Sequence, residues 1–255
     1  MTVGQLTEPT PNPSFPPPAG PRNLPQCPQE GGLRKSRIAM DIEQARFNMV
    51  EQQIRTWEVL DPAVLDLLFV VRREDYVPPE HRSLAFADLE LPLPGGERMW
   101  APKLEARVLQ ELKLHRGESV LEIGTGSGYF TALLAASAGD VTSVEIDPAL
   151  AMAAKARLAR HGVANVRVEV GDGARGWGEE HYDAIVLTGS TPLLPERFPA
   201  QLKPNGRVFA IVGEPPAMTA RLVAWTAPGS RVTTDLFETV VKPLKNAATP
   251  SRFRF

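Results

Sequence analysis

The chain has 255 residues, of which 43% are hydrophobic, and a formal net charge of −2 at pH 7. A chain of this length and composition can bury one good core, so we expect one main domain with appendages. The near-neutral charge does not indicate a strongly basic surface, and nucleic acid is therefore not favoured as a partner.

Cysteine and histidine usage argues against a disulfide framework and against a metal site. Cys27 is the only cysteine, and the four histidines are scattered without the spacing of metal ligands. A lone cysteine fits a reducing compartment, so we expect a cytoplasmic protein. Because the cysteine and histidines lack the spacing of metal ligands, we expect no bound metal. No apolar run approaches the roughly 20 residues that span a bilayer, and no membrane partner is expected.

The first segment, residues 1–39, is rich in proline and poor in aliphatic side chains. Such a composition cannot bury enough apolar surface to offset the entropy of ordering, so it predicts a disordered tail. The first helical pattern opens at Met40, which is an alternative to Met1 as the start of the chain.

Residues 40–102 are predicted to form an N-terminal helical cover and a loop beside the active site. Apolar side chains recur at helical spacing from Ile42 to Thr56, and a second helix is expected from Pro62 after the cap candidate Asp61. The stretch from Ala85 to Pro102 is rich in proline and glycine, which indicates a loop. Because this loop enters the core domain directly, it is well placed to line a ligand site.

Residues 103–255 alternate strand and helix patterns, which is typical of a parallel α/β sheet. Helices are expected over Lys103–Leu112 and Pro148–Arg160, with further helices in the remaining gaps. Strands are expected over Ser119–Ile123, Val141–Glu145, Val166–Val170, Ala184–Thr188 and Arg207–Val212. Ligands of such sheets bind at the carboxyl ends of the strands.

A glycine-rich turn follows the first of these strands. Val120–Tyr129 reads V-L-E-I-G-T-G-S-G-Y, with glycines at Gly124, Gly126 and Gly128. Bare backbone before a helix N-terminus suits a nucleotide-like ligand. A dinucleotide fingerprint would need glycine in place of Tyr129, a Walker A loop needs a lysine, and a G-x-S-x-G elbow fails on both glycines. What remains is E-x-G-x-G-x-G, which resembles motif I of the class I S-adenosylmethionine (SAM) methyltransferases; a tight turn that binds nothing is the alternative.

Other polar residues at strand ends are expected around the same crevice. Glu145 can accept hydrogen bonds from both ribose hydroxyls, and Asp172 can accept one from an adenine amino group while Gly173 leaves room for the ring. Thr188 ends a further strand. Glu122 either reaches the ligand's amino group, directly or through water, or braces the turn by accepting hydrogen bonds from backbone N–H groups. The alternative for Glu145 is a carboxylate that is simply solvated, and the alternative for Asp172 and Gly173 is an ordinary Asp-Gly turn.

These segments together resemble the protein-L-isoaspartate O-methyltransferase family, over about Phe47 to Lys245. The matching segments are Arg72–Pro78 (R-R-E-D-Y-V-P), Val120–Tyr129, Ser143–Glu145, Asn165–Val166, Gly171–Gly173, Leu202–Arg207 and Lys242–Leu244, the last in place of the family's V-P-L closure. The resemblance implies a Rossmann-like class I methyltransferase fold with a mostly parallel sheet flanked by helices. It also implies SAM as the cofactor and methylation of the isoaspartyl carboxylates of damaged proteins for repair. We expect a monomer, although the sequence itself does not fix the oligomeric state.

The resemblance also implies which residues bind the cofactor. They are Met99, Glu122, Gly124, Thr125, Gly126, Gly128, Glu145, Ile146, Asp172, Gly173 and Thr188.

The loop before the glycine turn departs from the family pattern. The family reads G-Q-T-I-S-x-P, with hydroxyls that position the isoaspartyl carboxylate, whereas this chain, aligned on Pro102, has Arg98 for the threonine and Trp100 for the serine. Arg98 can make a bidentate carboxylate contact, and transfer to an ionised carboxylate requires orientation rather than a base. Three alternative roles are open for Trp100: its ring stacks on a ligand, it fills the substrate pocket, or it is a packing residue of the loop.

Arg98 and Trp100 are thus the candidates at the catalytic positions, and they motivate two alternatives. One is a diverged methyltransferase for another carboxylate or a small molecule. The other is a SAM-binding protein without turnover. A nicotinamide-binding protein is a third interpretation of the turn.

Overall fold

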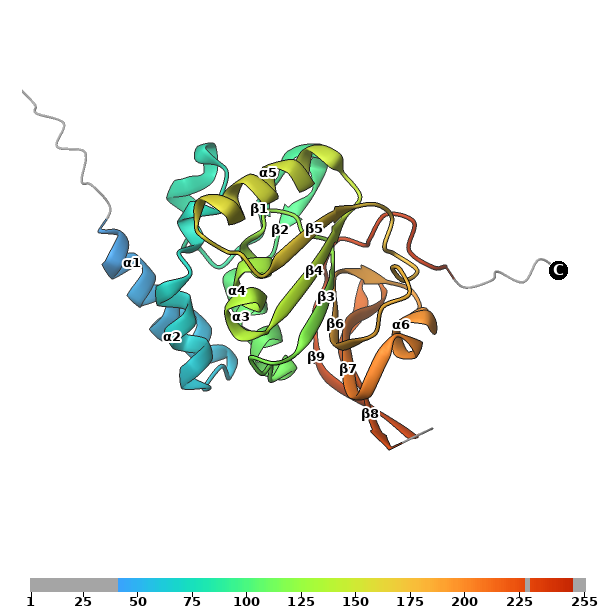
Figure 1. Ribbon diagram of the computed structural model, residues 1–255. Helices are drawn as coiled ribbons and strands as arrows, with labels where there is room; N and C mark the ends of the chain where they lie inside the picture. Colours follow the sequence, from blue (N-terminus) through green and yellow to red (C-terminus); the bar gives the residue numbers. More distant parts are fainter. Residues whose placement is uncertain (1–40, 228–229, 250–255) are drawn as a thin grey trace, which may run out of the picture. The chain divides into compact units, whose positions relative to one another are not determined.

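The computed structural model describes residues 41–227 and 230–249, which belong to one compact unit, Met40–Phe255 (Figure 1). The proline-rich tail predicted for residues 1–39 lies outside the described residues. The predicted helical cover and core are parts of this same unit.

The helices are α1 (Ile42–Asn48), α2 (Pro62–Val70), α3 (Pro102–Leu112), α4 (Tyr129–Ser137), α5 (Pro148–Arg160) and α6 (Arg197–Ala200). The strands are β1 (Leu91–Pro92), β2 (Arg98–Met99), β3 (Ser119–Ile123), β4 (Asp140–Glu145), β5 (Val166–Val170), β6 (Tyr182–Thr191), β7 (Leu202–Glu214), β8 (Ala217–Ala227) and β9 (Ser230–Glu238). Across the described ranges, every helix is too short or too polar to cross a membrane.

The two N-terminal helices begin where the sequence predicts. Asp41 caps α1 by accepting a hydrogen bond from the backbone N–H of Gln44 at 3.1 Å, and the helix continues through a π-helical turn, Met49–Ile54. Asp61 caps α2 by accepting from the N–H of Ala63 at 2.9 Å. An aspartate side chain at this position satisfies an N–H group that the helix itself leaves free. Both predicted helices are therefore confirmed.

The main sheet of the described residues has seven strands in the order β5-β4-β3-β6-β7-β8-β9. Neighbours from β5 to β7 run parallel, whereas β8 and β9 pair antiparallel. The predictions for β3 and β5 match to the residue, and those for β4, β6 and β7 fall inside longer strands. Strands β8 and β9 were not predicted. The expectation of a helix in every gap was wrong for residues 171–181, which connect β5 to β6 without one.

Alternating side chains of the central strands enter two different cores. Val120 of β3 packs with α3, α4 and α5, whereas Leu121 packs on the opposite face with Phe198 of α6. The period of two in a strand produces this division, and it explains why the parallel strands are almost continuously apolar. Figure 1 shows α3, α4 and α5 together on one side of the sheet and α6 on the other.

The order of the strands fixes where a ligand can bind. From β3 the chain proceeds outward to β4 and β5, and it then returns to place β6 on the other side of β3. The crossover connections therefore diverge at the carboxyl ends of β3 and β6, which leaves a crevice there. The glycine turn lies at this switch point.

Candidate active site

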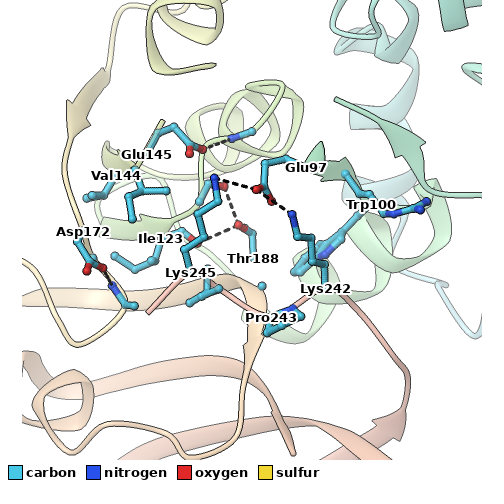
Figure 2. Close-up of a pocket in the computed structure, with 18 of the residues that line it drawn as sticks. Glu97, Trp100, Ile123, Val144, Glu145, Asp172, Thr188, Lys242, Pro243 and Lys245 are labelled. Carbon is cyan, nitrogen blue, oxygen red and sulfur yellow. Dashed lines mark hydrogen bonds and ion pairs between the residues drawn. The ribbon is translucent and has the colours of Figure 1, made fainter. Parts of the chain in front are cut away.

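One crevice at the carboxyl ends of β3, β4, β5 and β6 brings most of the predicted site residues together. It encloses about 710 Å³, a volume that includes space open to solvent. Its lining includes the predicted residues Arg98, Trp100, Gly124, Gly126, Glu145, Ile146, Asp172, Gly173 and Thr188. Figure 2 shows Asp172 and Val144 at one end of the crevice and Trp100 at the other.

Gly124 is held where only a glycine fits. Its φ is +104°, and a Cβ atom at this position would clash with the hydroxyl oxygen of Thr188. That hydroxyl lies 2.6 Å from the carbonyl oxygen of Gly124, and the N–H of Gly124 donates to the carbonyl of Val144 at 2.8 Å. The turn is thus fixed to both β4 and β6, with its backbone exposed to the crevice.

Glu145 at the end of β4 lies directly beside the turn. Its two carboxylate oxygens accept hydrogen bonds from the N–H groups of Gly126, at 2.9 Å, and Asp147, at 3.1 Å. A carboxylate has about four acceptor positions, so two remain for hydroxyl groups of a ligand. The side chain is buried apart from its face on the crevice, which makes it a strong acceptor for a diol.

Asp172 and Gly173 form the far end of the crevice together with two apolar side chains. The carboxylate of Asp172 accepts from the N–H of Ala174 at 3.0 Å and from the side-chain amide of Asn246 at 2.9 Å. A Cβ atom at Gly173 would lie 2.8 Å from Cδ1 of Ile123. Ile123 and Val144 thus border a narrow apolar slot next to a carboxylate.

This set of groups fits SAM. The diol acceptor lies between two other features of the crevice. On one side is the apolar slot with its carboxylate, which suits an adenine, and on the other is the bare backbone of the glycine turn. When bound, SAM supplies an activated methyl group on a sulfonium. Within residues 41–227 and 230–249, no three His, Cys, Asp or Glu side chains gather as they would around a metal ion.

Glu122 lies beneath the crevice and does not line it. One carboxylate oxygen accepts hydrogen bonds from the hydroxyls of Thr131 and Ser143, each at 2.6 Å, and the other oxygen is buried without a hydrogen-bond partner. The Thr125 hydroxyl extends this network by pairing with Ser143 at 2.6 Å. In the structure Glu122 therefore joins β3, β4 and α4 through hydroxyls, rather than through the backbone N–H groups that the sequence suggested.

Burial raises the pKa of Glu122 to about 8, with a smaller contribution from the nearby Glu145. The folded-state pKa lies above the ordinary 4.5, so the group stabilises the fold fully below about pH 4.5 and this contribution is lost as the pH rises toward 8. We expect Glu122→Gln to remove this loss. Relative to the variant, the wild type should lose up to about 1.4 kcal/mol of unfolding free energy per pH unit across this window.

Urea unfolding of both proteins at about pH 5 and about pH 8 measures the difference. Comparison with the Glu122→Gln variant cancels the other titrating groups. Parallel stability profiles would show that Glu122 does not titrate in this range.

The loop before the glycine turn forms the opposite wall. Trp100 is 6% exposed, and its ring packs against Phe130 with ring centroids 5.7 Å apart. The carbonyl of Trp100 accepts a hydrogen bond from the guanidinium of Arg73 at 2.6 Å. Arg98 is about half exposed, and its guanidinium lies 3.9 Å from the carboxylate of Glu90. Both side chains thus occupy the expected wall of the crevice.

Two further predicted residues line a smaller adjoining pocket rather than the crevice, and Gly128, like Glu122, lines neither. Met99 and Thr125 line this pocket against the glycine turn. Gly128 precedes α4 with a φ of +84°, and a Cβ atom there would lie 3.3 Å from Cβ of Ala154. Its role is therefore close packing of α4 on α5.

The C-terminal segment supplies crevice residues that sequence reasoning missed. Lys242, Leu244 and Lys245 line the crevice, and Asn246 binds Asp172. Ser190 of β6 holds this segment, since its carbonyl accepts from the N–H of Leu244 at 2.9 Å. The K-P-L match to the family's closing segment was the available signal, but nothing in the sequence indicated that its lysines face the ligand.

A glycine turn at the switch point of a parallel sheet, with a carboxylate after the next strand, is the arrangement of the class I SAM-dependent methyltransferases, and this chain is a member of that class. A family model described as "Protein-L-isoaspartate(D-aspartate) O-methyltransferase (PCMT)" matches residues 44–247. The chain belongs to this family, which confirms the resemblance seen in the sequence.

Individual relatives agree with the family match. Protein-L-isoaspartate O-methyltransferase 1 of Rhodopseudomonas palustris (strain HaA2) is 45% identical over 169 residues, which are 66% of this chain and 69% of the relative. Protein-L-isoaspartate O-methyltransferase of Anaeromyxobacter dehalogenans (strain 2CP-C) is 42% identical over 189 residues, 73% of this chain and 90% of the relative.

Solved structures confirm the predicted fold. One protein-L-isoaspartate O-methyltransferase aligns with a TM-score of 0.66 and 27% identity, covering 79% of this chain and 65% of that one. A putative enzyme of this name from Plasmodium falciparum, in complex with S-adenosyl-L-homocysteine, aligns with a TM-score of 0.67 and 19% identity, covering 77% of this chain and 96% of that one.

Proposed function

We propose that this enzyme transfers the methyl group of SAM to the carboxylate of isoaspartyl residues in damaged proteins. The observation that carries the proposal is the family match over residues 44–247, which includes both walls of the crevice. Glu145, Asp172 and Gly173 are proposed to bind the nucleoside of SAM, and the wall at Arg98 and Trp100 is proposed to face the acceptor.

The chemistry asks little of the protein beyond orientation. A carboxylate oxygen of the acceptor attacks the methyl carbon, the carbon–sulfur bond breaks, and its electron pair remains on sulfur, which gives a methyl ester and S-adenosyl-L-homocysteine. No proton moves, so the reaction does not require a general base. Alignment of the two reactants can contribute about 7–11 kcal/mol to lowering the barrier.

A pair of peptides tests the proposal. With labelled SAM, we expect the enzyme to methylate a peptide that contains isoaspartate and to leave its aspartyl twin unlabelled, because the two differ only in where the backbone leaves the residue. Labelling of both peptides, or of neither, would contradict the isoaspartyl specificity.

The composition of the acceptor wall supports a second candidate. Arg98 and Trp100 replace the family's hydroxyl residues, and a bulky ring at this wall narrows the acceptor side. A methyltransferase for another carboxylate or a small molecule would bind S-adenosyl-L-homocysteine tightly while neither peptide became labelled. A protein that binds SAM without turnover would also bind S-adenosyl-L-homocysteine tightly, but it would leave every carboxylate substrate unlabelled, not only the two peptides.

We further infer that the enzyme acts as a monomer in the cytoplasm. The single cysteine, Cys27, supports a reducing compartment. Light scattering after size exclusion measures the mass in solution, and a mass of twice 27.8 kDa would contradict the monomer.

A further inference from the structure

Two lysines from the C-terminal segment converge on one carboxylate at the acceptor end of the crevice. The ammonium groups of Lys242 and Lys245 lie 2.8 Å and 3.1 Å from the same oxygen of Glu97. Lys242 also donates to the carbonyl oxygen of Gly96 at 2.9 Å. Figure 2 shows Glu97 between the two lysines, with Trp100 on one side and Thr188 on the other.

This arrangement already functions as a carboxylate site, with a carboxylate of the chain itself in place. Burial disfavours the charged form of Glu97, yet the attraction of the two ammonium groups of Lys242 and Lys245 outweighs burial and lowers the pKa of Glu97. Two ammonium groups on one oxygen give short, charge-assisted contacts of the kind that bind carboxylates well. All three side chains line the same crevice as Gly124 and Glu145.

We propose that Lys242 and Lys245 form a clamp that binds the acceptor's carboxylate, and that Glu97 occupies this clamp until the acceptor displaces it. The inference rests on the proposed function, since it concerns the acceptor of that same reaction. The clamp would position the acceptor carboxylate, which the hydroxyl residues do in the family pattern at the positions that Arg98 and Trp100 occupy here. Lys242 itself stands where the family's closing segment has an apolar valine.

The exchange is feasible on charge and on access. Lys242 and Lys245 both pair with Glu97, and Glu145 and Asp147 also attract Lys245. An incoming carboxylate that displaces Glu97 therefore replaces one negative charge on the two ammonium groups with another. The lysine side chains are 37% and 44% exposed, so a ligand can reach them. The bond from Lys242 to the Gly96 carbonyl keeps its ammonium group in place when Glu97 leaves.

Removal of the clamp should weaken acceptor binding while leaving the cofactor site intact. In the enzyme saturated with S-adenosyl-L-homocysteine, we expect Lys242→Met with Lys245→Met to raise the Kd of the isoaspartyl peptide about tenfold, as measured by calorimetry. In turnover, KM should rise by a similar factor and kcat by less than about threefold in either direction. Lys155→Met on the exposed face of α5 makes the same chemical change outside the crevice and should alter neither value.

Glu97→Gln separates a clamp from a structural ion pair. It removes the competing charge, so the peptide should bind about threefold more tightly, whereas a purely structural role of Glu97 would predict weaker binding. Lys242→Arg with Lys245→Arg retains both charges and should restore most of the affinity lost in the methionine pair. If the methionine pair no longer bound S-adenosyl-L-homocysteine, the glutamine and arginine variants would carry the test.

Succinate, titrated separately, distinguishes failure of the clamp from failure of the proposed function. Wild type that binds succinate through the lysines but neither binds nor methylates the isoaspartyl peptide would retain the clamp and remove the isoaspartyl function. Equal peptide affinity in wild type and the methionine pair would overturn the clamp even if the peptide were methylated. Wild type that binds neither probe would overturn it as well.

Discussion

Glu145→Ala is expected to weaken the binding of S-adenosyl-L-homocysteine by about 1–3 kcal/mol, or about 5- to 150-fold in Kd. The carboxylate is buried at the end of β4, and it accepts from the N–H of Gly126 at 2.9 Å. Alanine would remove the acceptor for the ligand's hydroxyls, and it would also leave that N–H without its partner in the turn. Isothermal titration calorimetry measures the change directly.

Two further variants show whether the loss belongs to the acceptor oxygens of Glu145. Glu145→Gln keeps one carbonyl oxygen and should lose less affinity than alanine does. Glu169→Ala, on the exposed side of β5 and outside the crevice lining, should bind as wild type does. An alanine variant with unchanged affinity would place the ribose elsewhere.

The parts of the fold that were predicted to the residue are those whose determinants are local. Helix α5 begins at Pro148 because Asp147 caps it, accepting from the N–H of Ala149 at 2.8 Å. Strand β3 ends at Ile123, directly before Gly124, where only glycine fits. Caps, prolines and glycines act within a few residues, so the sequence displays them.

The parts that were missed depend on distant contacts or on weak patterns. Strand β9 is exposed along most of its length, so it lacks the apolar run that marks a buried strand. The expected helix between β5 and β6 fails because Gly176 and Gly178 both have positive φ, and glycine is a poor helix former. The glycine density of residues 171–178 was a signal against that helix.

The site residues divide in the same way, into those with a local signal in the sequence and those placed by distant contacts. Glycines and strand-end carboxylates could be found from spacing, whereas Lys242 and Lys245 reach the crevice only because Ser190 holds their segment some 50 residues away in sequence. Strand alternation could have corrected the view of Glu122. It shares a face of β3 with Val120, which packs on α4, and not with Ile123, which lines the crevice.

Trp100→Ser is expected to lower the free energy of unfolding by about 3 kcal/mol and to raise isoaspartyl methylation per folded molecule several-fold. The stability loss follows from the burial of the ring and its packing on Phe130. The gain follows from the backbone, because Arg73 holds the Trp100 carbonyl at 2.6 Å whatever the side chain is. A serine there would present its hydroxyl where the family pattern has one.

Trp100→Ala distinguishes the hydroxyl from the space that the ring vacates. Both variants open the wall and lose similar stability, so a higher kcat/KM in serine than in alanine belongs to the hydroxyl, while equal gains belong to the space. Urea unfolding gives the folded fraction by which each rate is corrected. If neither variant gains activity, the acceptor wall has diverged beyond this residue. Acceptor positioning would then depend on charged groups such as Arg98 and the lysine clamp. Removal of these groups in the Trp100→Ser background should lower the methylation activity by more than the serine hydroxyl can restore.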